Sequence, residues 1–388
     1  MTLLAGDLGG TKTLLALCDA TGEPLYTRQF DSRAHNSLED MVATFLADPE
    51  VKRQPSPVAA GLGVAGPITE VRLPDRADAG DGAAGSGWGQ RASITNLGYQ
   101  IDAGALRDRF GLQSVRLAND FYALSLYASR LVRQIEAQRP TDPSQRGLLP
   151  PSLADRVALL SDPAQAEPDP DGNLCVLGAG TGMGQALVVR GRALRHAAFP
   201  APRPPSGGNA VIVATEGGHT DFAPRDELEQ DLLRFLHARF PDHVSVERVL
   251  CGGGLHTLYE FLAAREPQRV SDAVTRELAE AGAAAPAVVS AHGLAGTDGL
   301  CQLALTRFVM LYGAEASNLA LKSMATGGVI IGGGVARKIL PRLRDGLFRE
   351  HFVRKGRFRA LCERMPIYVL LDPLAGLRGA AYLVSPAL

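Results

Sequence analysis

The stretch Leu3–Leu17 constrains the fold of this chain more than any other. An apolar run ends at Asp7, the pair Gly9–Gly10 follows, and a second apolar run begins behind Lys12. Two apolar runs around a glycine turn predict a β-hairpin. Adjacent glycines adopt positive φ freely and leave their N–H groups uncovered, which suits a polyphosphate, and Asp7 could hold a hydrated Mg²⁺ beside it. An ordinary tight turn with a surface acid explains this stretch equally well.

Neither of the two best-known phosphate loops matches this hairpin. A P-loop requires adjacent Gly and Lys, whereas Thr11 separates Gly10 from Lys12. The dinucleotide fingerprint fails here and also in a second glycine cluster, 178–184, where Met183 occupies the position of the third glycine. The chain therefore carries neither a Walker loop nor a Rossmann signature.

The second glycine cluster also lies between two apolar runs, 174–177 and 186–189, and predicts a second hairpin. About 170 residues separate the two hairpins, which is a typical domain size. Two such hairpins favour a duplicated architecture with a nucleotide held between the halves, and a chance pair of glycine-rich turns is the alternative.

Composition excludes several classes of protein. The chain has 388 residues, of which 46% are hydrophobic and 21% charged, and a net charge of −1 without a basic run, so nothing favours nucleic acid as a partner. The five cysteines are odd in number and lack C-x-x-C spacing, as expected in a reducing compartment. The start lacks a basic segment, and no apolar run reaches the roughly 20 residues of a membrane span. We expect a cytoplasmic protein without membrane contact.

Helices and strands follow from periodicity and from capping residues. We expect the region 133–170 to be an insertion or linker, and 75–90 and 190–209 to be further insertions. The remaining expected strands are 24–30, 58–64, 114–117, 329–331 and 367–371, and the expected helices are 37–47, 101–110, 121–131, 226–239, 300–324 and 374–383.

Polar residues at the ends of these elements are open to two interpretations. Asn119 and Asp120 precede an apolar helix, so spacing alone favours an N-cap over chemistry. Glu216 and His219 flank a glycine turn that is too poor in ligands for a metal site, and a solvated turn is the alternative. Glu247 could be a helix-terminal acid. The turn 332–334 opens a helix and could seat an adenosine or be a plain connection.

Six segments together resemble the bacterial glucokinases, which have the fold of hexokinases, heat-shock ATPases and actin. These segments are 6–11, 117–121, 178–182, 216–224, 245–252 and 331–335. The resemblance implies a two-domain α/β fold of the actin-like ATPase (ribonuclease H-like) type, with duplicated mixed sheets flanked by helices. It implies a small domain of residues 1–130 plus 372–388 and a large domain of residues 131–371.

The resemblance also implies an activity, which is ATP-dependent phosphorylation of D-glucose at its 6-hydroxyl to give glucose 6-phosphate and ADP. In this reading Asp120 is the general base, which replaces the capping interpretation for that residue, and Asp7 faces Mg²⁺ through water. The implied sugar ligands are Asn96, Asn119, Asp120, Glu216, His219 and Glu247. The implied nucleotide contacts are Asp7, Gly9, Gly10, Thr11, Lys12, Gly180, Thr181, Gly182, Gly332, Gly333 and Gly334. We expect a homodimer.

One residue departs from the family pattern, and one absent motif separates the chain from a sister family. Lys12 stands where many members have Asn, and its side chain can lie beside the phosphates. Nothing like the His and Cys zinc site of the related repressor-kinase branch follows His219, so we expect no structural zinc. The alternatives are a kinase for another hexose or amino sugar and a non-catalytic regulator that binds ATP or sugar.

Overall fold

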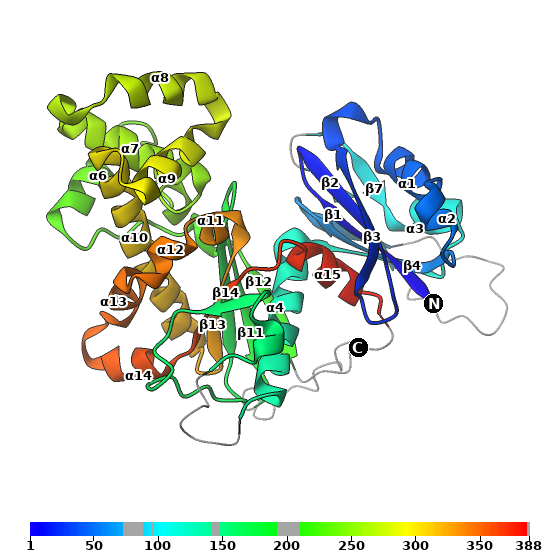
Figure 1. Ribbon diagram of the computed structural model, residues 1–388. Coiled ribbons are helices and arrows are strands. Elements are labelled where there is room, and N and C mark those ends of the chain that lie inside the picture. Colours follow the sequence, from blue (N-terminus) through cyan, green and yellow to red (C-terminus); the bar gives the residue numbers. More distant parts are fainter. Residues whose placement is uncertain (73–87, 95–96, 141–147, 192–209, 386–388) are drawn as a thin grey trace. The chain divides into compact units, whose positions relative to one another are not determined.

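A computed structural model describes residues 1–72, 88–94, 97–140, 148–191 and 210–385. These residues form two compact units. The first unit contains residues 1–131 and 373–385, and the second contains residues 132–191 and 210–372. Each unit is built on its own central sheet (Figure 1).

The first unit has a five-stranded sheet in the order β3-β2-β1-β4-β8. Strands β1, β2 and β3 form an antiparallel meander, and β4 and β8 continue the sheet parallel to β1. A small antiparallel sheet of β5, β6 and β7 lies in the same unit. The strands are β1 (Thr2–Leu8), β2 (Lys12–Cys18), β3 (Pro24–Asp31), β4 (Pro57–Val64), β5 (Ile68–Arg72), β6 (Trp88–Ser93), β7 (Gln100–Asp102) and β8 (Ser114–Asn119).

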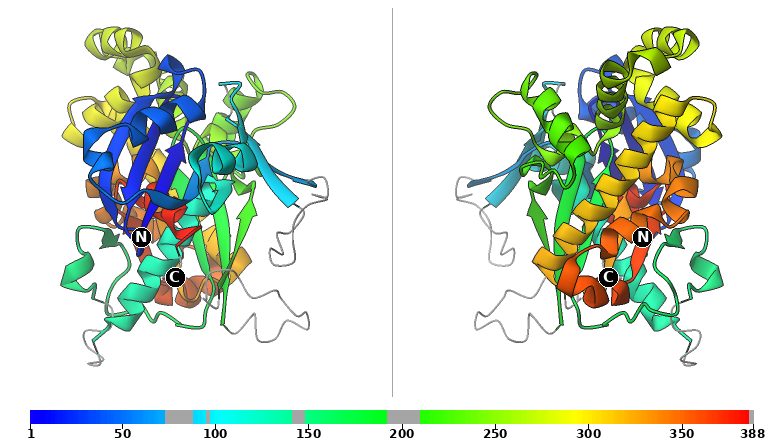
Figure 2. Two further views of the ribbon diagram at one scale, coloured as in Figure 1. Left: turned by 90° about the vertical axis from the view of Figure 1, so that its right-hand side faces the viewer. Right: turned by 90° about the vertical axis from the view of Figure 1, so that its left-hand side faces the viewer.

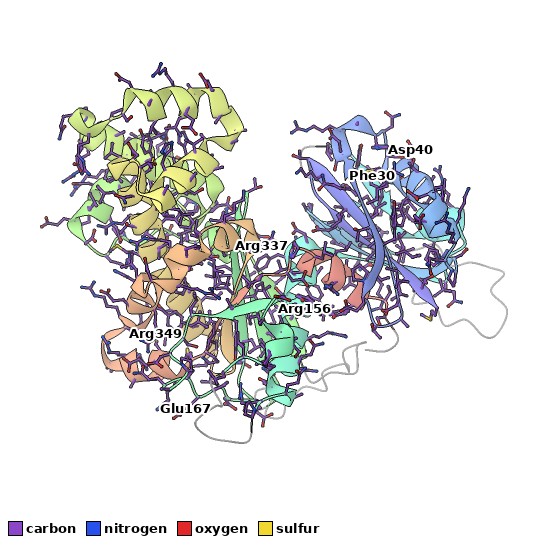
Figure 3. All side chains as sticks on the ribbon, in the orientation of Figure 1. Phe30, Asp40, Arg156, Glu167, Arg337 and Arg349 are labelled. Carbon is purple, nitrogen blue, oxygen red and sulfur yellow. The ribbon has the colours of Figure 1, made fainter. Side chains whose placement is uncertain are left out.

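The two faces of this sheet are covered by different helices, and β1 shows why. Leu4 and Leu8 pack into an apolar cluster that includes Phe30 and residues of α1 (Leu38–Leu46), α2 (Pro49–Lys52) and α3 (Ala103–Phe110) (Figure 3). Leu3 and Ala5 face the other side, against α15 (Ala375–Tyr382) and the start of α4 (Asp120–Ala137). Because side chains alternate along a strand, Asp7 lies on the α15 side.

Glycines allow α15 to approach both the sheet and α4 closely. A Cβ atom placed on Gly61 of β4 would lie 1.9 Å from the carbonyl oxygen of Ala380. A Cβ atom on Gly379 would lie 1.8 Å from the carbonyl oxygen of Ala123 in α4. No side chain fits at either position, so this packing depends on glycine.

The second unit repeats the same strand order. Its six-stranded sheet runs β12-β11-β10-β13-β14-β9, in which β10, β11 and β12 form an antiparallel meander and β13 and β14 run parallel to β10. Strand β9 is added antiparallel at the edge. The strands are β9 (Val157–Leu159), β10 (Leu174–Ala179), β11 (Met183–Arg190), β12 (Ala210–Thr215), β13 (Gly328–Gly332) and β14 (Ile367–Leu370).

The buried helix α10 (Gly299–Ser323) is central to the helical layer of the second unit (Figure 1, Figure 2). It packs with α7, α9 and α13 against the face that carries Cys175 and Leu177 of β10. The other helices are α6 (Glu227–His237), α7 (Gly252–Arg265), α8 (Asp272–Ala281), α9 (Ala285–Ala295), α11 (Gly333–Lys338), α12 (Leu340–Arg344), α13 (Leu347–Val353) and α14 (Arg359–Arg364). The 3₁₀ helices are η1 (Ser32–Ala34), η3 (Pro151–Leu153), η4 (Gly217–His219), η5 (Val246–Arg248), η6 (Pro267–Arg269), η7 (Gly282–Ala284) and η8 (Gly356–Phe358).

The two hairpins and the strands and helices named above from periodicity are present, with boundaries shifted by a few residues. The expectation of an insertion or linker over 133–170 is wrong for part of that segment. Helix α4 continues to Ala137 because Ile135 extends its buried face, and β9 pairs with β14 in the main sheet. The expected insertions 75–90 and 190–209 lie largely outside the described residues.

Candidate active site

The turn of the first hairpin is held by a buried serine. The Ser32 hydroxyl donates to the Gly9 carbonyl at 2.9 Å and lies 3.0 Å from the Thr13 hydroxyl, while the Ser32 N–H donates to the Thr11 carbonyl at 3.0 Å. Gly9 N–H donates to the carbonyl of Lys12, which starts β2 with an exposed side chain. In the described chain the N–H groups of Gly10 and Thr11 meet no acceptor. The turn thus presents free donors, as an anion site requires.

Asp7 lies beside this turn at the end of β1. Burial, together with the negative charge of Asp120, raises the pKa of Asp7 from 3.8 to about 6. A Cβ atom on Gly376, at the start of α15, would lie 2.9 Å from Oδ2 of Asp7. Any side chain at that position would clash with the carboxylate, so glycine permits this close approach.

Asn119 and Asp120 lie where β8 ends and α4 begins. Asn119 Oδ1 accepts the N–H groups of Phe121 and Tyr122 at 3.0 and 3.3 Å, so Asn119 is a helix N-cap. Asp120 Oδ1 accepts the Phe121 N–H at 2.8 Å. Burial raises the pKa of Asp120, and the hydrogen bond from Phe121 opposes that rise.

The two carboxylates share one edge of the first sheet. Asp7 is paired in register with Gly63 of β4, and Gly63 is paired with Ala118 of β8, just before Asn119. Asp7 and the end of β8 are therefore about 10 Å apart across two strand spacings. Gly63 lies between them without a side chain, and its absent Cβ would be 3.5 Å from the Cα atom of Asp120.

The turn of the second hairpin is fixed by its neighbours. Gly180 N–H donates to the carbonyl of Gly182, and Gly252 at the start of α7 donates to the carbonyl of Gly180, both at 2.8 Å. Glu247 Oε2 accepts the Met183 N–H at 2.7 Å, and a Cβ atom on Gly182 would lie 2.5 Å from that oxygen. Thr181 lies exposed at the tip. Glu247 thus contacts the hairpin directly and is more than a helix-terminal acid.

Glu216 precedes η4 and His219 ends it, and η4 lies against the same hairpin. A Cβ atom on Gly218 would be 2.1 Å from the Met183 carbonyl oxygen. The segments of η4 and η5 are joined by a bridge between Asp221 and Ser245. His219 Nε2 lies 3.9 Å from Glu216 Oε2, and both side chains are largely exposed. The second unit thereby brings Glu216, His219 and Glu247 around the start of β11.

The third glycine turn joins β13 to α11. Gly333 has a φ of +83°, and its absent Cβ would be 2.3 Å from the Ala179 carbonyl oxygen, so the turn packs against the end of β10. Gly332 ends β13, and a Cβ atom on Gly334 would meet nothing within 4 Å. Open space therefore lies beside Gly334, and Arg337 follows on α11 (Figure 3).

Two residues at these turns carry no signal in the sequence. Ser32 supports the first turn, and the buried Tyr312 of α10 connects the other two. Tyr312 accepts the Ala179 N–H at 3.1 Å and donates to the Gly332 carbonyl at 3.4 Å. Each hydrogen-bonds to residues at distant positions of the sequence, so the spacing of neighbouring residues cannot reveal these contacts. Asn96, an expected sugar ligand, lies outside the described residues.

No group of three or more His, Cys, Asp or Glu side chains in the described ranges could hold a metal ion. Among the described helices, none has both the length and the apolar character that crossing a membrane requires.

Solved structures match this architecture over nearly the whole chain. A glucokinase from an Antarctic psychrotroph has a TM-score of 0.70 at 26% identity and covers 99% of this chain and 98% of its own. A glucokinase of the ROK family from Streptomyces griseus, in complex with glucose and AMPPNP, has a TM-score of 0.56 at 18% identity with 99% of both chains covered, which shows the fold alone. The protein is a two-domain α/β protein of the actin-like ATPase and hexokinase class, as expected.

Sequence comparison gives the family within this class. The family model described as Glucokinase matches residues 4–76 and 155–387. Glucokinases of Nostoc punctiforme and of Caulobacter sp. strain K31 are each 32% identical, and cover 98% and 99% of this chain and 97% and 95% of their own. The chain belongs to the glucokinase family, whose members are enzymes that phosphorylate glucose with ATP and Mg²⁺. The expected family, enzyme class and cofactors are confirmed.

Proposed function

We propose that Asp120 is the general base that accepts the proton of the glucose 6-hydroxyl during phosphoryl transfer. The observation that carries this proposal is the position of Asp120 at the carboxyl end of β8, on the same sheet edge as Asp7 and the first glycine turn. One of its oxygens is held by Phe121 N–H, which fixes the carboxylate. Its raised pKa moves it toward the operating pH, where a base is most effective.

Phosphoryl transfer depends mainly on alignment and on stabilising charge. The free N–H groups of Gly10 and Thr11, with Lys12 beside them, would bind phosphate oxygens, and the turn at Thr181 and Gly182 would do the same. Asp7 is a single carboxylate beside the first glycine turn, which fits a Mg²⁺ ion that keeps most of its water ligands. Gly332 to Gly334 would seat the adenosine, since open space lies beside Gly334.

Each of the two units contains residues of the proposed set of sugar ligands. Asn119 uses Oδ1 as a helix cap, so its amide N–H₂ is the part available to a hydroxyl. Glu247 uses Oε2 for Met183 and would offer Oε1. Glu216 and His219 are exposed at η4, and Asn96 completes the proposed set. An epimer that leaves one such partner unpaired costs about 1 to 3 kcal/mol.

The test of the base is Asp120→Asn, because the amide oxygen can still accept the Phe121 N–H. We expect turnover to fall by about 10²-fold or more while the glucose dissociation constant stays within about tenfold. Coupled-assay kinetics and calorimetry measure the two quantities. Asp40→Asn on α1 removes a carboxylate of the same unit and is the matched control (Figure 3). Retained turnover in Asp120→Asn would remove Asp120 from this role.

The range of substrates and the state of the protein are also proposals. We propose glucose as the preferred hexose, and a panel of hexose epimers and amino sugars tests this preference. Equal rates on glucose and mannose would contradict it. A cytoplasmic location is supported by five free, buried cysteines. A homodimer that binds no nucleic acid is proposed from the family resemblance and the lack of net positive charge, and light scattering tests the dimer.

A further inference from the structure

A basic cavity of about 350 Å³ lies in the second unit, away from every residue proposed above for sugar or nucleotide. Its volume is at the lower end of the ~300–1,000 Å³ typical of small-molecule sites. It forms where the start of α6, the middle of α10 and the end of α13 meet, and Arg349 marks α13 in Figure 3. The lining residues are Arg225, Asp226, Ala314, His351, Arg354 and Lys355.

Two cations at this cavity form no direct ion pair. Arg225 is neutralised by the fully buried Glu229, at 2.5 Å, and Asp226 is paired with Arg307. Arg354 has no carboxylate partner among the described residues, and Lys355 Nζ donates to a neutral acceptor, Asn318 Oδ1, at 2.5 Å. The carboxylate that acts on Lys355 is the buried Glu315, which lies behind Asn318 and not in the lining.

The surroundings of Lys355 and His351 disfavour the charged forms of both side chains. Burial, reinforced by the charge of Arg225, lowers the pKa of Lys355 and also that of His351. His351 Nδ1 lies 3.4 Å from Arg225 Nη1, so a neutral ring accepts there and keeps its proton on Nε2. The cavity therefore offers several donors and two cations outside ion pairs, Arg354 and Lys355, which an anion could engage.

We propose that this cavity binds a compact metabolite anion that carries a phosphate ester, and that its occupancy weakens glucose binding. The charge of the ligand would be met by Arg354 and Lys355, whose charge-assisted hydrogen bonds are strong in a partly buried site. The proposed anion site is independent of the catalytic and ligand roles assigned above. The proposed effect on glucose binding rests on the proposed sugar ligands at η4.

A chain of hydrogen bonds runs from the cavity to Gln185, and the Gln185 side chain packs against Gly217 of η4. Lys355 donates to Asn318, whose amide donates to Glu315 Oε2 at 2.9 Å. Gln185 Nε2 donates to Glu315 Oε1 at 2.9 Å, and both side chains are buried. A Cβ atom on Gly217 would lie 2.2 Å from Gln185 Oε1, so this side chain packs against the backbone of η4. In the sequence Gly217 lies between Glu216 and His219. An anion that binds Lys355 in the cavity would weaken its hydrogen bond to Asn318. The packing of Gln185 against η4, where the proposed sugar ligands Glu216 and His219 lie, would weaken in turn.

Calorimetry with 3-phosphoglycerate as the probe tests the site, with AMPPNP and Mg²⁺ present at saturation so that the nucleotide site is filled. We expect one site per chain, and a loss of affinity of about tenfold or more in Arg354→Ser. Glycerol 3-phosphate, which lacks the carboxylate, should bind the same site more weakly. Arg344→Ser removes an exposed cation from the neighbouring α12 and should leave the affinity unchanged. Equal affinity in the two variants, or no binding to the wild type, overturns the site.

Glucose titrations with and without the probe, at equal ionic strength, test the coupling. We expect the glucose dissociation constant to rise about fivefold or more, and the probe to lose affinity by the same factor when glucose is present. Arg354→Ser should lose this effect while keeping its turnover. Probe binding without any change in glucose affinity refutes the coupling and leaves the site. Neither result depends on Asp120, so failure here and failure of the proposed base are distinguishable.

Discussion

At the scale of single residues, the proposed catalytic groups are held at a cost to stability. The pKa of Asp7 is raised from 3.8 to about 6, so the folded protein binds a proton that the unfolded chain has released between these values. Relative to the ionised form, the protonated carboxyl of Asp7 stabilises the folded protein. This stabilisation is fully present below pH 3.8 and is lost as the pH rises through about 6. At neutral pH the ionised carboxylate therefore costs about 3 kcal/mol.

Asp7→Asn should remove this cost. In the absence of Mg²⁺ and nucleotide we expect the variant to be more stable than the wild type by up to about 3 kcal/mol at pH 7.5, and equally stable near pH 3.8. Urea unfolding across this pH range measures the difference, and Asp40→Asn serves as the control. A wild-type pH dependence that is unchanged in Asp7→Asn would show that the carboxylate is not strained.

Residue-level prediction from the sequence succeeds where the signal is local. The Gly9–Gly10 turn and the capping role of Asn119 both follow from neighbouring residues, and both are present. Ser32 and Tyr312 could not be found in this way, because the groups they support lie at distant positions of the chain. The ligand roles assigned by resemblance stay predictions.

At the scale of elements, α15 is attached to the first unit through glycine contacts. Gly379→Ala places a methyl group 1.8 Å from the Ala123 carbonyl oxygen, and a backbone atom cannot move aside as a flexible side chain can. We expect a loss of about 3 kcal/mol, or roughly 6 to 12 °C in the melting temperature of the first unit. Gly253→Ala, whose new methyl would find its nearest neighbour at 3.8 Å, is the control. Equal melting of the two variants in calorimetry would contradict the close packing.

The elements that the sequence did not reveal have physical reasons in common. Helices α7, α8 and α9 are not among the elements predicted from the sequence. Helix α9 is rich in alanine and has no clear apolar face, so periodicity gives little signal. Strand β9 has three residues, too few for an alternation, and its partner β14 is distant in sequence. The helix α10 was predictable because it is apolar over a length that strands do not reach, and most of its residues are buried.

At the scale of the whole molecule, the strand order 3-2-1-4-5 occurs twice, which agrees with the duplication expected from the two hairpins. The first unit is nevertheless discontinuous, because the chain returns to it after Asp372 to add α15. The apolar face of β1 that carries Leu3 and Ala5 is covered by Leu377 and Ala380. The first unit therefore depends on the last residues of the chain, and the second unit does not.

A chain truncated after Asp372 tests this dependence. Without α15, the face of β1 with Leu3 and Ala5 becomes solvent-exposed, so we expect the thermal transition of the first unit to disappear or to fall steeply. The transition of the second unit should persist, since its core is formed by residues 132–372 alone. Differential scanning calorimetry separates the two transitions, and a chain ending at Ser385, which keeps α15, is the control. Both transitions surviving would show that α15 contributes little to the first unit, whereas loss of both would show that the two units fold as one cooperative body.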